Sequence, residues 1–275
     1  MNKKERVKVM GVNFDPVTYR EALDRIFFML KDGKQHQVVT PNPEILLKAQ
    51  SDAKYRTILN RASLSVPDGT GIIWAASLEG SLSIKKGLWH MLLMLVKPSK
   101  VKRILPERVT GADLMRDVLN MASKNGNNYR IFLLGARDGA GKQIQSSYRF
   151  KDKNCQIVGS HEGSPNPSED ANIVSEINES GADILFVAYG SPQQEKWIHR
   201  NMKNIPSVKV AIGVGGAFDF LAGNVKRAPK FWRNAGLEWL WRLINQPRRV
   251  QRIWNAVFVF PYLLVVRSIN IKFVK

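Results

Sequence analysis

The residue best suited to chemistry follows a short apolar stretch of the sequence. Asp68 stands in the turn Pro67–Asp68–Gly69, directly after Ser63–Val66. This stretch is typical of a buried strand, and the apolar run 72–76 beyond the turn is typical of a helix. Ligands of parallel α/β sheets bind beyond the carboxyl ends of the strands, where helix N-termini favour anions. Asp68 is therefore either a reactive carboxylate at this edge or a residue that shapes the turn and caps the helix.

Other polar residues follow predicted strands in the same way. The segment 40–44 (TPNPE) ends a strand over 37–40, and its two prolines make a stiff loop from which Asn42 can begin a helix. The apolar strand 184–188, expected near the centre of the sheet, ends at Gly190–Ser191–Pro192. A helix then begins, so Gln193 or Gln194 could hold a sugar hydroxyl or an amide at the same edge.

The glycine-rich segment 135–142 (GARDGAGK) follows another predicted strand, over 129–134. It is not a P-loop, because its Gly–Lys pair has the wrong spacing from Gly135. Gln143 also stands where Ser or Thr would bind magnesium. The segment is either a turn that lets a phosphate approach closely or simply a tight turn.

Composition excludes several classes of site. The only cysteine, Cys155, rules out an internal disulfide framework and a cysteine-rich zinc site. The four histidines have no HxH or HxxxH spacing, so we predict neither a metal nor a cofactor. No apolar stretch of signal-peptide length follows the charged residues 1–6, and the predicted location is cytoplasmic.

The net charge of +19 is confined mainly to two segments. Residues 226–275 contain eleven Lys and Arg and one acid, a net +10, and residues 85–103 contain six Lys and Arg and no acid. Such polarity suggests an anionic surface or an anionic substrate rather than general solubility.

The alternation of strands and helices predicts an α/β fold, with a mostly parallel, Rossmann-like sheet and helices on both faces. A basic helical C-terminal appendage follows it. We divide the chain into a core over 1–223, which carries a basic apolar insert over 82–103, and an appendage over 224–275. The predicted strands are 7–14, 37–40, 63–66, 129–134, 156–158, 184–188 and 208–212; the predicted helices include 18–30, 45–50, 55–60, 72–76, 113–123 and 171–179.

Two basic apolar segments leave membrane contact open. The run 88–96 (LWHMLLMLV) is too short to span a bilayer, so it either packs on the core or lies in a membrane interface. The run 254–266 is short and interrupted by Pro261, and lying on the membrane fits it better than spanning.

Several motifs together resemble the WecG/TagA/CpsF glycosyltransferases, and the resemblance covers about residues 9–252. The insert near 82–103 is longer than in compact members of the family. The motifs are residues 67–71 (PDGTG), 190–197 (GSPQQEKW), 214–223 (VGGAFDFLAG), 226–229 (KRAP), 236–243 (GLEWLWRL) and 246–249 (QPRR).

The resemblance implies inverting transfer of N-acetylmannosamine from UDP to GlcNAc-diphospho-undecaprenol, in synthesis of the teichoic acid linkage unit or a related envelope glycan. It implies a UDP-sugar donor and a polyprenyl-diphosphate-linked acceptor as partners. It also implies a position on the anionic inner face of the cell membrane and self-association into a homo-oligomer. The family's proposed base falls on Asp68; its substrate-binding residues fall on Thr40, Asn42, Arg108, Gln194, Arg242, Arg249 and Arg252.

The residue chemistry agrees with this reading. An inverting transferase needs one carboxylate to deprotonate the acceptor hydroxyl, and positive charge on the departing diphosphate. The chain has no DxD pair to hold a metal on a nucleotide sugar, whereas its C-terminal segment is rich in arginine. We therefore predict a metal-independent reaction, with UDP-N-acetylmannosamine, its uronic acid or another UDP-hexose as donor.

Two other classes of protein compete with the enzyme. A pI of about 10.1 would suit a nucleic-acid-binding protein, but no recognisable module carries the basic residues, and the interleaved aromatics favour lipid. We therefore expect no nucleic-acid partner. A scaffold of the same fold without catalysis is the other alternative, which a transfer assay distinguishes.

Overall fold

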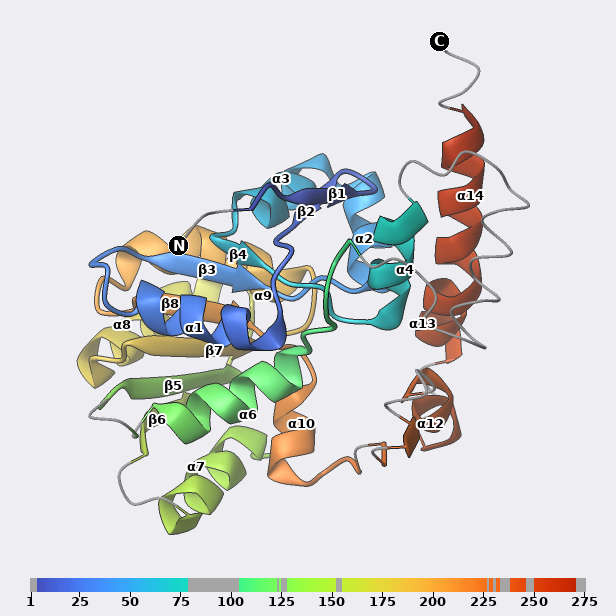
Figure 1. Ribbon diagram of the computed structural model, residues 1–275. Coiled ribbons are helices and arrows are strands. Elements are labelled where there is room, and N and C mark those ends of the chain that lie inside the picture. Colours follow the sequence, from blue (N-terminus) through green and yellow to red (C-terminus); the bar gives the residue numbers. More distant parts are fainter. Residues whose placement is uncertain are drawn as a thin grey trace.

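The computed structural model describes residues 4–78, 104–122, 124, 128–151, 155–226, 228–229, 231–232, 238–245 and 250–270. In this part of the chain a six-stranded parallel sheet has the strand order β4-β3-β8-β7-β5-β6 (Figure 1). The prediction of a parallel α/β sheet is confirmed, and β7 lies inside it. The insert over 82–103, with its apolar run 88–96, lies outside the described residues. The strands are β3 (His36–Val39), β4 (Leu64–Ser65), β5 (Arg130–Gly135), β6 (Gln156–His161), β7 (Ile184–Ala188) and β8 (Val210–Gly213).

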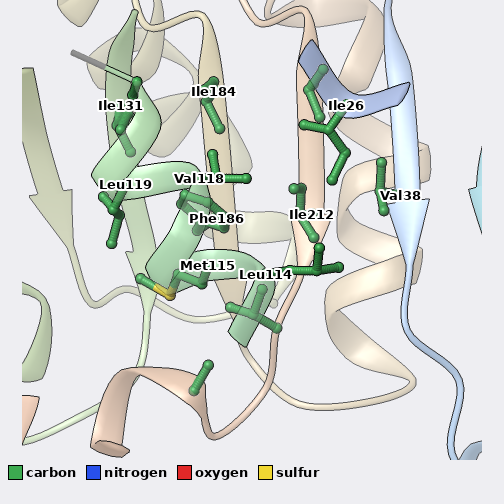
Figure 2. Close-up of a cluster of buried hydrophobic side chains, with 14 of the residues drawn as sticks. Ile26, Val38, Leu114, Met115, Val118, Leu119, Ile131, Ile184, Phe186 and Ile212 are labelled. Atoms are coloured by element: carbon green, nitrogen blue, oxygen red, sulfur yellow. The ribbon is translucent and has the colours of Figure 1, made fainter. Parts of the chain in front are cut away.

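Helices cover both faces of the sheet because successive strand residues point to opposite sides. On β7, Ile184 and Phe186 face one hydrophobic cluster, and Leu185 and Val187 face another. Figure 2 shows the first cluster, where Phe186 lies near Val118. The first face carries α1 (Tyr19–Met29), α6 (Gly111–Met121), α7 (Ala140–Lys151) and α10 (Ala217–Ala222); the second carries α8 (Asp170–Ser180) and α9 (Gln193–Asn201).

Helix starts follow the capping residues in the sequence. The Thr18 hydroxyl accepts from the backbone N–H of Glu21, whose carboxylate accepts from Thr18 N–H in return, which begins α1. Asn42 caps α2 (Pro43–Ser51), as predicted, with its Oδ1 3.0 Å from the N of Ile45. Two further helices, α3 (Ala53–Arg61) and α4 (Thr70–Leu78), complete this side of the fold.

The prediction of one strand over 7–14 is wrong. The segment is a hairpin in which β1 (Val7–Val9) and β2 (Val12–Phe14) pair antiparallel. Met10 and Gly11 form its turn with φ of 48° and 81°, the left-handed values that such two-residue turns require. Because both strands place apolar residues in one cluster, the sequence pattern alone did not show the reversal.

A buried carboxylate fastens the hairpin to β4, the strand that leads to Asp68. Asp15 is fully buried, and its Oδ2 accepts from the backbone N–H of Ser65 at 2.9 Å. Arg6 and Arg25 neutralise it from 3.0 and 3.1 Å. An edge strand of only two residues thus gains a second attachment beside its pairing with β3.

The C-terminal helices lie along one side of the molecule, and the segment 255–270 packs beside α2 and α4 (Figure 1). They are α12 (Glu238–Asn245), α13 (Val250–Trp254), a π-helical turn (Asn255–Val259) and α14 (Phe260–Asn270). Phe260 is fully buried in the cluster formed by the hairpin, α2 and α4. A Cβ on Gly71 would lie 3.8 Å from its ring, so α14 packs directly behind the Asp68 loop. The division at residue 223 stays a prediction.

Candidate active site

A pocket of about 130 Å³ lies at the carboxyl ends of four neighbouring strands, β4, β3, β8 and β7. This is the edge at which a parallel sheet binds its ligands. Five of the eight predicted site residues line it, namely Thr40, Asn42, Asp68, Gln194 and Arg252. The structure therefore brings together residues that are up to 212 positions apart in the chain.

Backbone hydrogen bonds fix the loop that carries Asp68. The N–H of Asp68 donates to the carbonyl of Pro41 at 3.0 Å, and the N–H of Val109 donates to the carbonyl of Pro67 at 2.9 Å. Gly69 has φ +127°, a value that other residues rarely adopt. Asp68 precedes α4 by two residues and lines the pocket.

Thr40 and Asn42 present polar groups from the loop after β3. The Thr40 hydroxyl donates to the carbonyl of Gly213 at 3.3 Å, which leaves oxygen lone pairs as acceptors. Asn42 uses its Oδ1 to cap α2, so the group it can offer a ligand is the Nδ2 amide donor. Both residue types suit sugar hydroxyls or an acetamido group.

Gln194 is committed to hydrogen bonds within the protein. Its Oε1 accepts from the backbone N–H of Gly190 at 3.2 Å and from that of Gly215 at 3.0 Å. Its Nε2 donates to Glu195 at 2.8 Å, and the residue is 2% exposed. A Cβ on Gly213 would lie 2.7 Å from this amide, so only glycine leaves room for it there. The amide thus joins the loops after β7 and β8.

A buried carboxylate, which sequence reasoning missed, supports this amide. Glu195 is 1% exposed and accepts from Gln194, from the Ser191 hydroxyl at 2.8 Å and from the Tyr55 hydroxyl at 3.0 Å. Burial raises the pKa of Glu195, although these hydrogen bonds act in the opposite direction. The backbone carbonyl of Glu195 accepts from Gln37 at 3.0 Å, so one residue connects β3, α3 and the loop after β7.

Arg252 reaches the pocket from α13 and forms an ion pair there. Its Nε lies 2.7 Å from Oε2 of Glu44, which also lines the pocket. Lys48 lies 3.0 Å from Oε1 of Glu44 and donates to the carbonyl of Ser191 at 2.8 Å. The single carboxylate is shared by two cations, so positive charge remains at this edge of the pocket.

The remaining predicted residues are not placed in the pocket. Arg108 does not line it, although the neighbouring Val109 is bonded to the loop of Asp68. Arg249 and the side chain of Arg242 lie outside what the structure describes. The substrate-binding roles expected for Arg108, Arg242 and Arg249 stay predictions.

The glycine-rich loop after β5 does not border this pocket. The N–H of Gly139, directly before α7, donates to Glu162 Oε1 at 2.8 Å. Ala136 and Asp138 have φ of 67° and 57°, so the chain turns sharply there. A protein carboxylate thus occupies the end of α7 that could receive a phosphate.

Two spacings in the sequence pointed toward Glu44 and Glu195, which the sequence analysis did not place in the site. Glu44 and Lys48 have the i,i+4 spacing of a helical ion pair, and Glu195 lies four residues after Ser191. Neither spacing reveals Arg252 or Tyr55 as a partner, because these contacts span 208 and 140 residues.

Comparison with known proteins decides the family. The model of the WecG/TagA/CpsF glycosyl transferase family matches residues 7–86 and 90–272. The chain is 30% identical over 269 residues to the N-acetylglucosaminyldiphosphoundecaprenol N-acetyl-beta-D-mannosaminyltransferase of Staphylococcus aureus (strain MRSA252), covering 97% of this chain and 95% of the relative. The chain belongs to the WecG/TagA/CpsF family of glycosyltransferases.

Among the residues that the structure describes, this glycosyltransferase has neither a cluster of metal-binding side chains nor a helix that could span a membrane. No three His, Cys, Asp or Glu side chains gather there in an arrangement that could hold a metal ion. None of the described helices is both long and apolar enough to cross a membrane.

The buried Glu195 of this glycosyltransferase predicts a pH effect on stability. Its pKa is raised above the ordinary value of 4.5, so its contribution to folding is complete below that pH and is lost as the pH rises through the folded pKa. Glu195→Gln keeps the shape and removes the titration. We expect the free energy of unfolding of the wild type, relative to Glu195→Gln, to fall as the pH rises above about 4.5 in urea titrations.

Glu179→Gln is the matched control, because Glu179 is exposed on α8. Its pH profile should follow that of the wild type. Parallel profiles for the wild type and Glu195→Gln would contradict the assignment of a raised pKa to Glu195.

Proposed function

We propose that this glycosyltransferase transfers N-acetylmannosamine from UDP-N-acetylmannosamine to GlcNAc-diphospho-undecaprenol, in synthesis of the teichoic acid linkage unit or a related envelope glycan. The observation that carries the proposal is the gathering of Thr40, Asn42, Asp68 and Arg252 around one pocket at the carboxyl edge of the sheet. The name of the Staphylococcus aureus relative, which aligns over nearly the whole of both chains, supports this donor sugar and this acceptor.

In the proposed reaction Asp68 is the general base. The acceptor hydroxyl attacks the anomeric carbon of the donor, and its proton passes to the Asp68 carboxylate. The new bond to the acceptor oxygen forms as the bond between the anomeric carbon and the UDP oxygen breaks, which inverts the configuration. UDP departs with the bonding electron pair, so negative charge develops on its diphosphate.

We further propose that arginine, not a metal ion, stabilises this charge. Arg252 borders the pocket and, being always protonated, can meet phosphate oxygens with paired N–H donors. Thr40 and Asn42 would orient the sugars, and Gln194 would position the loops around them.

Treatment with EDTA should leave the transfer rate unchanged, because the proposed reaction uses no metal ion. A loss of activity that Mg²⁺ or Mn²⁺ restores would contradict the proposal that arginine stabilises the diphosphate.

The central test is Asp68→Asn, assayed with UDP-N-acetylmannosamine and a short-chain GlcNAc-diphospholipid. Because an amide cannot accept the proton, we expect the turnover number to fall by about 10²–10⁴-fold. Donor affinity, measured by calorimetry, should change little.

Asp24→Asn provides the control, because Asp24 is an exposed carboxylate on α1 that pairs with Arg20 and does not line the pocket. It should keep full turnover. Near-normal turnover of Asp68→Asn would remove Asp68 from the role of base. The same assay with UDP-N-acetylmannosaminuronic acid tests the alternative donor.

We also propose that the enzyme works on the anionic inner face of the cell membrane. The acceptor is lipid-linked, and basic residues near such a surface contribute about 1 kcal/mol each. The C-terminal helices expose aromatic side chains: Trp254 is 56%, Phe258 53% and Tyr262 67% exposed. The rings of Trp254 and Phe258 lie 4.4 Å apart, so they form one apolar patch.

Binding to anionic vesicles tests this contact. In the proposed contact the exposed Phe258 ring enters the lipid interface. Burying about half of a phenylalanine side chain contributes roughly 1 kcal/mol, so Phe258→Ala should weaken partitioning into vesicles by roughly fivefold. Phe28→Ala is the matched control, because Phe28 is 63% exposed on α1. Equal partitioning of the two variants would contradict contact through the C-terminal patch.

A further inference from the structure

Glu44 is a charged residue in the pocket that the proposed reaction does not use. It lies in the first turn of α2, and its side chain is 16% exposed. Burial acts to raise the pKa of Glu44, but hydrogen bonds from Lys48 and Arg252 outweigh it, and the pKa lies below the ordinary value. Glu44 is therefore ionised at neutral pH, and a negative charge borders a pocket proposed to receive diphosphate.

The ion pair with Arg252 joins the C-terminal helices to the core. Apolar packing of Phe260 beside α2 and α4 sets the position of the helix backbone. It does not set the direction of the Arg252 side chain, which is 54% exposed. An exposed arginine has many rotamers, and fixing one of them requires a directed contact. The 2.7 Å bond from Arg252 Nε to Glu44 is such a contact.

The geometry of this bond suits a second ligand on the same guanidinium. Glu44 accepts from Nε–H, and a guanidinium carries four more N–H donors on its two terminal nitrogens. Two parallel N–H groups match two oxygens of a phosphate. Lys48 meanwhile shares the charge of Glu44 from 3.0 Å, which limits repulsion of an incoming anion.

We propose that Glu44 is a positioning residue, which holds the Arg252 guanidinium at the rim of the pocket so that its terminal nitrogens receive a substrate diphosphate. The proposal rests on the proposed function for the identity of the substrates. The diphosphate belongs either to the UDP donor or to the lipid-linked acceptor, and the experiment separates the two.

A double-mutant cycle tests the proposal, with wild type, Glu44→Gln, Arg252→Ala and the double variant. If Glu44 acts through Arg252, Glu44→Gln should lower kcat/KM by roughly fivefold to tenfold, as expected for weakening a hydrogen bond to a charged group. In the Arg252→Ala background the same change should have less than about a twofold effect. An equal loss in both backgrounds would overturn the proposal, because Glu44 would then act through α2 or Lys48.

Binding of pyrophosphate, measured by calorimetry, provides a readout that does not depend on transfer. Glu44→Gln should weaken it several-fold in the wild-type background only. Tighter binding would overturn the proposal, since Glu44 would then merely repel anions. If the wild type transfers no sugar to the acceptor, the proposed function fails. Pyrophosphate binding, measured across the same four proteins, still decides the role of Glu44.

Two further measurements complete the design. A raised KM for the acceptor with unchanged UDP affinity assigns the acceptor diphosphate, whereas weaker UDP binding assigns the donor. Asp170→Asn is the matched control, because it breaks another arginine–carboxylate contact between distant segments, with Arg200, away from the pocket. It should change kcat/KM by less than about twofold.

Discussion

The carboxamide of Gln194 holds together the two loops on which the pocket depends. Its oxygen accepts from the backbone of Gly190, after β7, and from that of Gly215, after β8. The buried Glu195 and the hydroxyls of Ser191 and Tyr55 fix its orientation. A buried amide with its donors and acceptors satisfied has one stable orientation, since any rotation would leave polar atoms unpaired. The shape of the pocket wall is thus set by a network inside the protein, and ligand groups are left to other residues.

The all-parallel sheet explains why the ligand-facing residues meet. Every strand ends at the same edge, so each loop that follows a strand contributes to one rim. Asp15 gives the short β4 a second attachment through Ser65, and the loop of Asp68 is bonded to Pro41. The proposed base therefore stands on a backbone that is held on two sides. Such a framework keeps a carboxylate at a constant distance from a bound sugar.

The C-terminal helices combine two properties that suit a lipid-linked substrate. One side contacts the core through Phe260 and Arg252, and exposed aromatic residues such as Trp254 and Phe258 lie elsewhere on the same segment. In the proposed function this places an arginine beside the pocket and an apolar surface toward the bilayer. A diphosphate at the membrane surface then lies between the lipid and the catalytic edge, which matches the chemistry of a polyprenyl diphosphate.

The sequence by itself determined the fold class, the family and much of the pocket. Alternating strands and helices predicted the parallel sheet, and the family resemblance pointed to Thr40, Asn42, Asp68, Gln194 and Arg252, which line one pocket. Asn42 as a helix cap was also readable, because a cap depends on residues only three positions away. Local spacing failed at Met10 and Gly11, where a two-residue turn reverses the chain within one apolar pattern.

The tertiary structure alone decided what the buried and paired side chains do. That the Gln194 amide joins two loops is visible only in the structure, and the spacings of Glu44 and Glu195 did not reveal their distant partners. Their partners, Arg252 and Tyr55, lie 208 and 140 residues away. Sequence periodicity reports contacts within one helix or strand, whereas these contacts arise only when separate elements pack around a common edge.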